Sequence, residues 1–414
     1  MSTTTISFKP IREICGRIAS EIPASKKGLE YHAAIGERVN NLPEEERKTL
    51  RESLNAFLIY MEKIDASDID VGGHGCSGKI WYRVFGNKSP LKMDVDLPIA
   101  ETDVLLHNIL TQTQREQLID RKSLDFSHTI QTDGNRNRRY RANMYMDLES
   151  LALNMRKIDT EIRPFKTLGV HPEIAKALSL KYYKYGLTLI TGITGSGKSS
   201  TLDTIIDANN RTVDAHIVVI ASPVELIHNP IRSVIRHREV GRDVMSFKEG
   251  AIQSLRQDPD IIVIGELRDP ETITTTLEIT DSGHKTFGTL HTSSAMESIE
   301  RILGEVPTEE QDRVRNRLAD VLTCVISQKL VSSLDGKRVL AKEVLLVTPS
   351  IRAAIRNNNV NEIYQMLNEG GEMGMNTMEQ DLKRLYDEGR ISKDEAFNNA
   401  NNKKRIQQLF NELD

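Results

Sequence analysis

Cysteine is scarce in this chain of 414 residues, and long apolar runs are absent. The three cysteines, Cys15, Cys76 and Cys324, lie far apart and form no C-x-x-C pair, so we expect unpaired thiols in a reducing compartment. No stretch of about 18 apolar residues exists, which predicts that no helix spans a bilayer. The N-terminal segment lacks the apolar centre and cleavage pattern of a secretory signal. The sequence therefore predicts a cytoplasmic protein.

An excess of charge of either sign is also missing. Lys and Arg number 55 against 59 Asp and Glu, which gives a net charge of −4 and argues against a broad nucleic-acid-binding surface. Hydrophobic residues make up 38% and charged residues 28%, as in an ordinary soluble globular protein. The chain is long for one compact core, so we expect two or more domains.

Changes in texture along the chain predict five regions. Residues 1–65 are predicted to be helical, with apolar residues at helical spacing. Residues 66–156 alternate short strands with glycines, which indicates a small α+β domain. The segment 157–168 shows little periodicity and is interpreted as a linker or hinge. Strands and helices then alternate over 169–345, the pattern of a doubly wound α/β domain, and 346–414 is predicted to be helical.

A glycine-rich loop is the strongest functional signal. Residues 192–199 read G-I-T-G-S-G-K-S and satisfy the pattern G-x-x-x-x-G-K-[ST] of phosphate-binding loops. In such a loop, backbone N–H groups surround the phosphates of ATP, Lys198 reaches the β and γ oxygens, and the hydroxyl of Ser199 ligates Mg²⁺. A strand over 187–191 and a helix from Lys198 are the expected context, and a glycine-rich turn without a ligand is the competing interpretation. The predicted ATP-binding residues are Gly192, Thr194, Gly195, Ser196, Gly197, Lys198, Ser199 and Ser200.

A candidate catalytic carboxylate follows a second apolar run. Residues 261–264 predict a central strand that is covered on both faces. Glu266 lies just past its end, where ligands bind in open α/β sheets, so its carboxylate can polarise the attacking water or hold the metal through its hydration shell. Asp260, at the other end of the strand, is a weaker candidate. Arg268 and Asp269 either join the site or form a loop salt bridge.

With these motifs, the chain resembles secretion ATPases of the type II secretion and type IV pilus class. The likeness runs from about residue 66 to the end and is strongest to the PilT and PilU group of pilus-retraction ATPases. Residues 280–295 resemble the histidine box of that family, and 235–243 and the stretches L-D-F-S-H-T-I and R-Y-R-A-N resemble further blocks. The resemblance implies a RecA-like ATPase domain after a small PAS-like domain, assembled as a hexamer.

Two histidines of the histidine box are implied to be sensors. By resemblance, His284 and His291 lie near the γ-phosphate of bound ATP. Seven residues separate them, so in a strand their side chains would project from opposite faces, and a shared zinc ion is not expected. An ordinary structural role is the competing interpretation.

The arginines of the small domain indicate an oligomer. Arg139, Arg141 and Asn143 fall on one face of a strand by its period of two, and the intervening residues fall on the other. By resemblance, matching arginines reach the nucleotide of the adjacent subunit in a hexameric ring and neutralise charge on the transferred phosphoryl group. Arg156 matches another arginine of that domain. A solvated charged face is the competing interpretation.

The sequence departs from the resembled family at its aspartate box. Where relatives carry T-I-E-D-P-I-E, residues 219–225 read V-I-A-S-P-V-E, so Pro223 and Glu225 remain but Ala221 and Ser222 replace two acids. Loss of a group that orients water can lower a rate by roughly 10²–10⁴. We therefore expect nucleotide binding to persist and hydrolysis to be slow.

These features predict a hexameric ATPase motor that couples ATP hydrolysis to retraction of a type IV pilus, and so to twitching motility. The expected location is the cytoplasmic side of the inner membrane. The expected partners are a platform protein of the pilus and a second pilus ATPase, with no nucleic acid. The alternative is an accessory subunit that binds ATP but hydrolyses little, because Ala221 and Ser222 replace the acids. A DNA-translocating ATPase of related fold is a third option, which the acidic balance does not favour.

Overall fold

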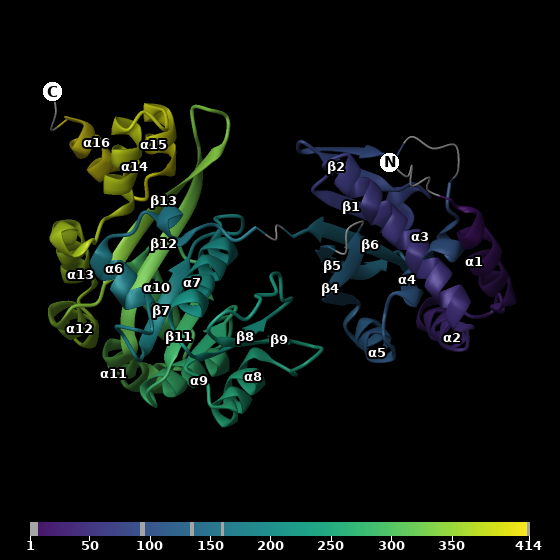
Figure 1. The fold of residues 1–414 in the computed structure, drawn as a ribbon, viewed down its shortest axis with the longest axis horizontal. Coiled ribbons are helices and arrows are strands. Elements are labelled where there is room, and N and C mark those ends of the chain that lie inside the picture. The colour runs from purple at the N-terminus through teal and green to yellow at the C-terminus, as the bar shows by residue number, and fades with distance from the viewer. Residues whose placement is uncertain (1–6, 92–95, 133–135, 159–160, 412–414) are drawn as a thin grey trace. The chain divides into compact units, whose positions relative to one another are not determined.

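The computed structural model describes residues 7–91, 96–132, 136–158 and 161–411. The chain forms two compact units, 1–160 and 161–414, and each has a hydrophobic core of its own (Figure 1). The boundary falls within the predicted linker 157–168, of which residues 159 and 160 lie outside the described part, as do the two chain ends. None of the described helices is both long and apolar enough to cross a membrane.

The first unit packs helices against one face of an antiparallel sheet. Within the described residues this sheet has six strands, in the order β3-β2-β1-β6-β5-β4. The strands are β1 (Asp68–Gly72), β2 (Trp81–Val84), β3 (Asn87–Pro90), β4 (Ser123–Thr132), β5 (Arg136–Asp147) and β6 (Ser150–Lys157). The helices are α1 (Lys9–Glu21), α2 (Gly28–Asn40), α3 (Glu44–Lys63), α4 (Ile99–Asn108) and α5 (Gln112–Arg121).

One apolar core joins these helices to the sheet. Tyr140, Ala142 and Met144 of β5 are buried in this core, and the residues between them face the other side of the sheet. Leu54 and Leu58 of α3 enter the same core, as their helical spacing predicts. The predicted helical region 1–65 thus shares its core with the predicted small domain, because apolar helix stripes need a second layer to cover them.

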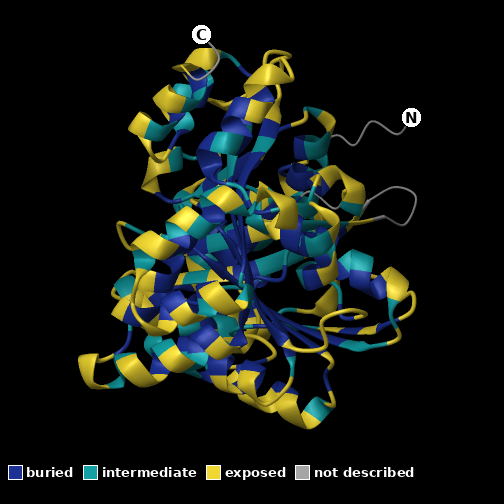
Figure 2. Ribbon diagram, turned by 90° about the vertical axis from the view of Figure 1, so that its left-hand side faces the viewer, coloured by how far each residue is buried: buried dark blue, intermediate teal, exposed yellow. Residues whose placement is uncertain are grey.

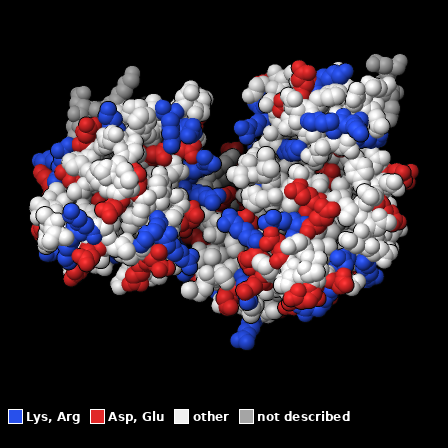
Figure 3. Space-filling view, turned by 180° about the vertical axis from the view of Figure 1, so that it is seen from behind, with Lys and Arg blue, Asp and Glu red and all other residues white. Residues whose placement is uncertain are grey.

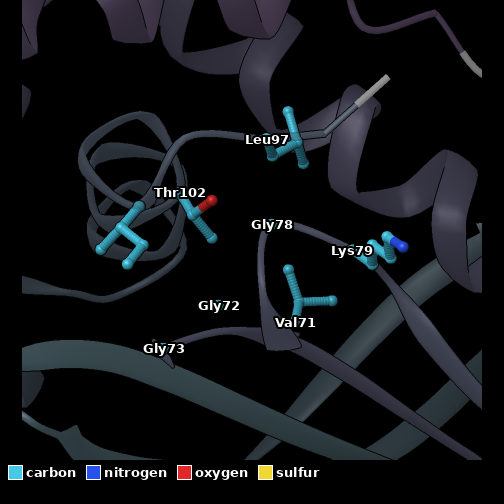
Figure 4. A pocket seen from close by; sticks show the side chains of 8 residues that line it. Val71, Gly72, Gly73, Gly78, Lys79, Leu97 and Thr102 are labelled. Carbon is cyan, nitrogen blue, oxygen red and sulfur yellow. The ribbon is translucent and has the colours of Figure 1, made fainter. Parts of the chain in front are cut away.

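Glycines shape the turn after β1. Gly72 has a φ of +83°, and a Cβ there would lie 2.5 Å from the carbonyl oxygen of Leu151, so only glycine fits this close approach. The turn borders a cavity of about 10 Å³ lined in part by Leu97 and Thr102, barely enough for one water molecule (Figure 4). The cavity is therefore far too small for a nucleotide.

The second unit is built on a mixed sheet. In its described part the sheet has seven strands, in the order β13-β12-β7-β11-β10-β8-β9. All neighbouring pairs are parallel except β12 with β13. The strands are β7 (Gly186–Thr191), β8 (His216–Ala221), β9 (Val234–Glu239), β10 (Ile261–Ile264), β11 (Lys285–Leu290), β12 (Leu322–Ser332) and β13 (Arg338–Leu346).

Helices cover this sheet, and its central strands are buried throughout their length. Every residue of β7, β10 and β11 is buried, and Figure 2 shows the strands in dark blue among exposed helix surfaces in yellow. This confirms the predicted doubly wound α/β domain. The helices are α6 (Pro172–Leu178), α7 (Lys198–Thr212), α8 (Phe247–Ser254), α9 (Pro270–Asp281), α10 (Ala295–Gly304), α11 (Gln311–Val321), α12 (Pro349–Arg356), α13 (Val360–Glu369), α14 (Met378–Asp387), α15 (Lys393–Asn399) and α16 (Lys403–Asn411).

The last helices pack onto the last two strands. Val331 of β12, together with Val339 and Ala341 of β13, forms a small apolar core with residues of α14, α15 and α16. The region predicted to be a helical tail is indeed helical, but α14 to α16 are held against the seven-stranded sheet rather than extending from it.

Candidate nucleotide site

The glycine-rich loop connects β7 to α7, in the predicted context. Gly192, Gly195 and Gly197 have φ values of +150°, +81° and +89°, which side chains disfavour. A Cβ on Gly192 would lie 2.5 Å from the carbonyl oxygen of Gln328 on β12. The side-chain Nε2 of Gln328 donates a hydrogen bond of 2.9 Å to the carbonyl oxygen of Ser196. No side chain caps α7, so the first N–H groups of this helix remain available to bind phosphate oxygens. This is the arrangement expected of a phosphate-binding loop.

The ammonium group of Lys198 lies against this loop. Its Nζ donates hydrogen bonds to the carbonyl oxygens of Gly192, at 2.6 Å, and Ile193, at 3.2 Å. Burial lowers the pKa of Lys198, and the negative charge of Glu266 opposes that shift. The carboxylate of Glu266 therefore lies close enough to stabilise the charged form of Lys198.

The remaining predicted ATP-binding residues lie on the loop or on the first turn of α7. Thr194, Ser199 and Ser200 are exposed, whereas Ser196 is buried. Within the described ranges, no cluster of three or more His, Cys, Asp or Glu could hold a metal ion. A phosphate-loop site does not require one, because Mg²⁺ takes most of its ligands there from phosphates and water, with a hydroxyl such as that of Ser199.

Glu266 and His291 meet at the same edge of the sheet. Glu266 lies two residues beyond the end of β10, and His291 directly follows β11, the parallel neighbour of β10. His291 Nε2 is 3.3 Å from Glu266 Oε1. Burial lowers the pKa of His291, the charge of Lys198 lowers it further, and Glu266 opposes both. The structure thus brings Lys198, Glu266 and His291 together.

The two charged residues after Glu266 have separate roles. Arg268 Nε lies 2.6 Å from Glu266 Oε1, so this arginine joins the site. Asp269 is the N-cap of α9, and its Oδ1 accepts a hydrogen bond of 2.8 Å from the backbone N–H of Thr272.

Within its own chain, His284 lies at the other end of β11 from the phosphate loop. It precedes β11, whereas His291 follows it, so about 20 Å of extended strand separates them. His284 Nδ1 lies 3.1 Å from Ser282 Oγ and 3.2 Å from the carbonyl oxygen of Ile279. It lines an open pocket of about 730 Å³ at the amino ends of the strands, together with Asp260.

The altered aspartate box lies beside the Glu266 loop. It begins within the last residues of β8 (His216–Ala221), which pairs with β10, and the N–H of Gly265 donates a hydrogen bond of 2.8 Å to the carbonyl oxygen of Ile220. A Cβ on Gly265 would lie 3.2 Å from Ala221 Cα, so the two segments are in close contact. Ser222 is exposed and Glu225 is half-buried. The two acids that are missing here would therefore have stood next to the loop that carries Glu266.

Sequence reasoning missed an acid–histidine pair on the helix of the phosphate loop. Asp203 of α7 accepts a hydrogen bond of 3.0 Å from His228 Nε2, and burial raises the pKa of Asp203. The ring of His228 stacks on that of His237, with centroids 5.8 Å apart. Glu239 was also missed: it is buried and accepts a hydrogen bond of 3.0 Å from the N–H of Val224. Glu239 ends the mostly polar strand β9 and Asp203 lies within α7, so neither acid follows an apolar run that could have marked it.

The arginines of the first unit lie on the uncovered face of its sheet. Arg139 and Arg141 alternate with buried residues as predicted, and Arg139 Nη1 donates a hydrogen bond of 3.2 Å to Thr129 Oγ1. Arg156 is tied to Asp68 by a contact of 2.7 Å between Nε and Oδ1. Basic and acidic side chains are otherwise interspersed over the visible face of each unit (Figure 3).

The chain is similar to known proteins in both sequence and fold. Residues 44–339 match the family described as Type II/IV secretion system protein. The chain is similar to the type IV pilus retraction ATPase PilT of Pseudomonas aeruginosa, with 37% identity over 86% of this chain and 99% of the relative. It is also similar to a twitching motility protein of Neisseria gonorrhoeae, with 34% identity over 77% of this chain and 84% of the relative.

A solved structure of the pilus retraction motor PilT with bound ADP superposes with a TM-score of 0.75. That chain is 34% identical, and the match covers 85% of this chain and 98% of that one. With the phosphate loop, the sheet edge and these likenesses in agreement, the chain belongs to the Type II/IV secretion system protein family and is an ATPase of that family.

Proposed function

We propose that the protein is a hexameric motor that couples ATP hydrolysis to retraction of a type IV pilus. The observation that carries the proposal is the meeting of Lys198, Glu266 and His291 at one edge of the sheet, in a chain similar to PilT along nearly its whole length. In open α/β sheets this edge is where ligands bind.

Each residue of the site has a defined task in this proposal. Lys198 exchanges the carbonyl oxygens that it now contacts for oxygens of the β- and γ-phosphates, and the loop N–H groups hold the same phosphates. Glu266 orients the attacking water, and His291 senses the γ-phosphate next to it. Ser199 holds Mg²⁺, which supplies positive charge to the phosphates when bound.

The arginines complete the site from a neighbouring subunit. Arg139 and Arg141 stand on a polar sheet face, where they neutralise charge on the transferred phosphoryl group of the adjacent protomer. Nucleotide state then changes the position of one unit relative to the other around the linker. The ring works at the cytoplasmic side of the inner membrane on the pilus platform protein, with a second pilus ATPase as a further partner.

A second function is favoured by the aspartate box. Ala221 and Ser222 lie beside the Glu266 loop and carry no carboxylate, as in a subunit that binds ATP but turns it over slowly. Such a subunit would regulate a competent pilus ATPase rather than drive retraction itself.

Phosphate release by the purified ring decides between the two functions. A motor releases phosphate at a rate that Lys198→Ala abolishes, and a strain that lacks the protein loses retraction. An accessory subunit releases little phosphate until Ala221→Glu and Ser222→Asp together restore turnover. A wild-type ring without turnover that the restored acids leave inactive would contradict both.

A further inference from the structure

The loop that carries His291 is held by residues from far along the chain. Residues 291–294 join β11 to α10. Asn401 Nδ2, from the segment between α15 and α16, donates a hydrogen bond of 3.0 Å to the carbonyl oxygen of Ser293. The first N–H of α10, that of Ala295, donates a hydrogen bond of 2.8 Å to Oε1 of the buried Glu343 on β13.

The amide of Asn401 is fixed at both of its ends. Lys329 Nζ of β12 donates a hydrogen bond of 2.7 Å to Asn401 Oδ1 and another of 2.7 Å to the carbonyl oxygen of Asn399. Lysine can only donate and the carbonyl of Ser293 can only accept, so the amide has one orientation that satisfies both. The N–H of Asn402 adds a bond of 2.7 Å to Glu379 Oε1 on α14.

Local bonds fix the loop to α10. Ser293 N and Oγ donate to Glu297 Oε2, at 2.7 Å and 2.5 Å, and Thr292 Oγ1 lies 2.6 Å from Ser298 Oγ. The start of α10 is in turn bonded to β13 through Ala295 and Glu343. The bond from Asn401 ties the loop to β12 through Lys329, one residue from the anchor of the phosphate loop at Gln328.

We propose that Asn401 is a positioning residue for ATP hydrolysis. Its amide fixes the backbone of Ser293, and this fixes the place of His291 beside Glu266. Asn401 acts through His291 and does not touch the nucleotide itself. The inference rests on the proposed sensing role of His291. Asn401 also couples α14 to α16 to the active site, because the segment 399–402 contacts both α14 and the loop that carries His291.

Two substitutions in the full-length protein separate the loop contact from packing of the C-terminal helices. Asn401→Asp keeps an acceptor for Lys329 but places a carboxylate oxygen against the carbonyl of Ser293, so only the loop contact is lost. Asn398→Ala, at an exposed position near the end of α15, is the control. We expect Asn401→Asp to lower kcat about tenfold, with ADP affinity unchanged, and the control to stay within twofold of wild type.

A double-mutant cycle with His291→Ala tests the route of the effect. If Asn401 acts through His291, adding Asn401→Asp to His291→Ala slows turnover no further. Wild-type kcat in Asn401→Asp, or losses that multiply in the double variant, would overturn the inference while leaving the proposed function in place. Wild-type kcat in His291→Ala would remove the sensing role, and the inference with it. Equal losses of ATP and ADP binding in Asn401→Asp would show a merely structural role.

Discussion

His291 Nε2 lies 3.3 Å from Glu266 Oε1, although 24 residues of sequence and a complete helix stand between the two. The contact exists because β10 and β11 are parallel neighbours, so the segments that leave their carboxyl ends emerge side by side. An imidazole and a carboxylate at this distance influence each other's charge, and the effect can be measured.

The titration of His291 should report the loss of its neighbour. The Glu266 carboxylate favours the protonated imidazole, against burial and the charge of Lys198. Glu266→Gln removes that support, so we expect the pKa of His291 to fall further below its ordinary value. Chemical shifts of the imidazole, followed across pH by NMR, check this. An unchanged or raised pKa would contradict the contact.

Glu266→Gln should also separate binding from hydrolysis. The amide retains the shape of the side chain but cannot act as a base or orient water as a carboxylate does, so we expect turnover to fall by about 10²–10⁴. ATP should still bind, because the phosphate loop is intact. Glu271→Gln, on the exposed first turn of α9, is the control. Phosphate release and nucleotide binding at equal protein concentration provide the comparison.

Lys198→Ala should weaken both nucleotide binding and turnover. The ammonium group is the side-chain cation on the loop, and its loss should lower turnover at least about 100-fold. Lys184→Ala changes an exposed lysine that lines the pocket at the opposite edge of the sheet, and turnover should be retained there. Equal activity in the two variants would remove Lys198 from the site.

Mixed rings should show whether Arg139 and Arg141 act on a neighbouring subunit. Rings of the double variant Arg139→Ala, Arg141→Ala and rings of Lys198→Ala should each be inactive. Suppose that every site combines a loop from one subunit with arginines from the next. In rings co-assembled from the two variants, about a quarter of the subunit interfaces then carry both an intact loop and intact arginines. Phosphate release from the mixture should then exceed that of either parent. No recovery, in rings shown to exchange subunits, would place the arginines in the same subunit or outside the site.

Stability should decline from mildly acidic to neutral pH partly through Glu343. Burial raises the pKa of Glu343 to about 7, whereas an exposed glutamate titrates near about 4.3. Between these values the folded protein holds a proton that the unfolded chain has released, so the free energy of unfolding falls as the pH rises and then levels off.

Glu343→Gln should flatten this part of the pH dependence. The amide oxygen can still accept from the N–H of Ala295, and it has no proton to lose. Above pH 7 the variant should therefore be more stable than the wild type by on the order of 3–4 kcal/mol. Asp103, whose pKa burial also raises to about 7, acts in the same window and remains in both proteins. Denaturant midpoints from pH 5 to pH 8 measure the difference, with Glu369→Gln as an exposed control.

Local pattern was enough to predict the phosphate loop, the strand at 261–264 and the place of Glu266. Those features depend on a few consecutive residues, and the structure reproduces them. The histidine box did not indicate that its two histidines lie at opposite ends of β11, with only His291 beside Glu266.

Other features of the site have no local signal. The amide of Asn401 meets Ser293 across 108 residues, and nothing in either segment marks the contact. Likewise, apolar stripes in 1–65 indicated helices but not the sheet that they would cover. Such pairings follow from how the layers close on one another rather than from composition.

The adjacent residues Gln328 and Lys329 make β12 intolerant of changes in length. Consecutive side chains of a strand point to opposite faces of the sheet. Here Gln328 hydrogen-bonds the phosphate loop and Lys329 hydrogen-bonds the C-terminal segment. Inserting or deleting a single residue upstream in this strand would move both side chains to the opposite face of the sheet, and both hydrogen bonds would be lost. In contrast, the exposed turn around Gly336, between β12 and β13, should tolerate inserted residues with little loss of stability.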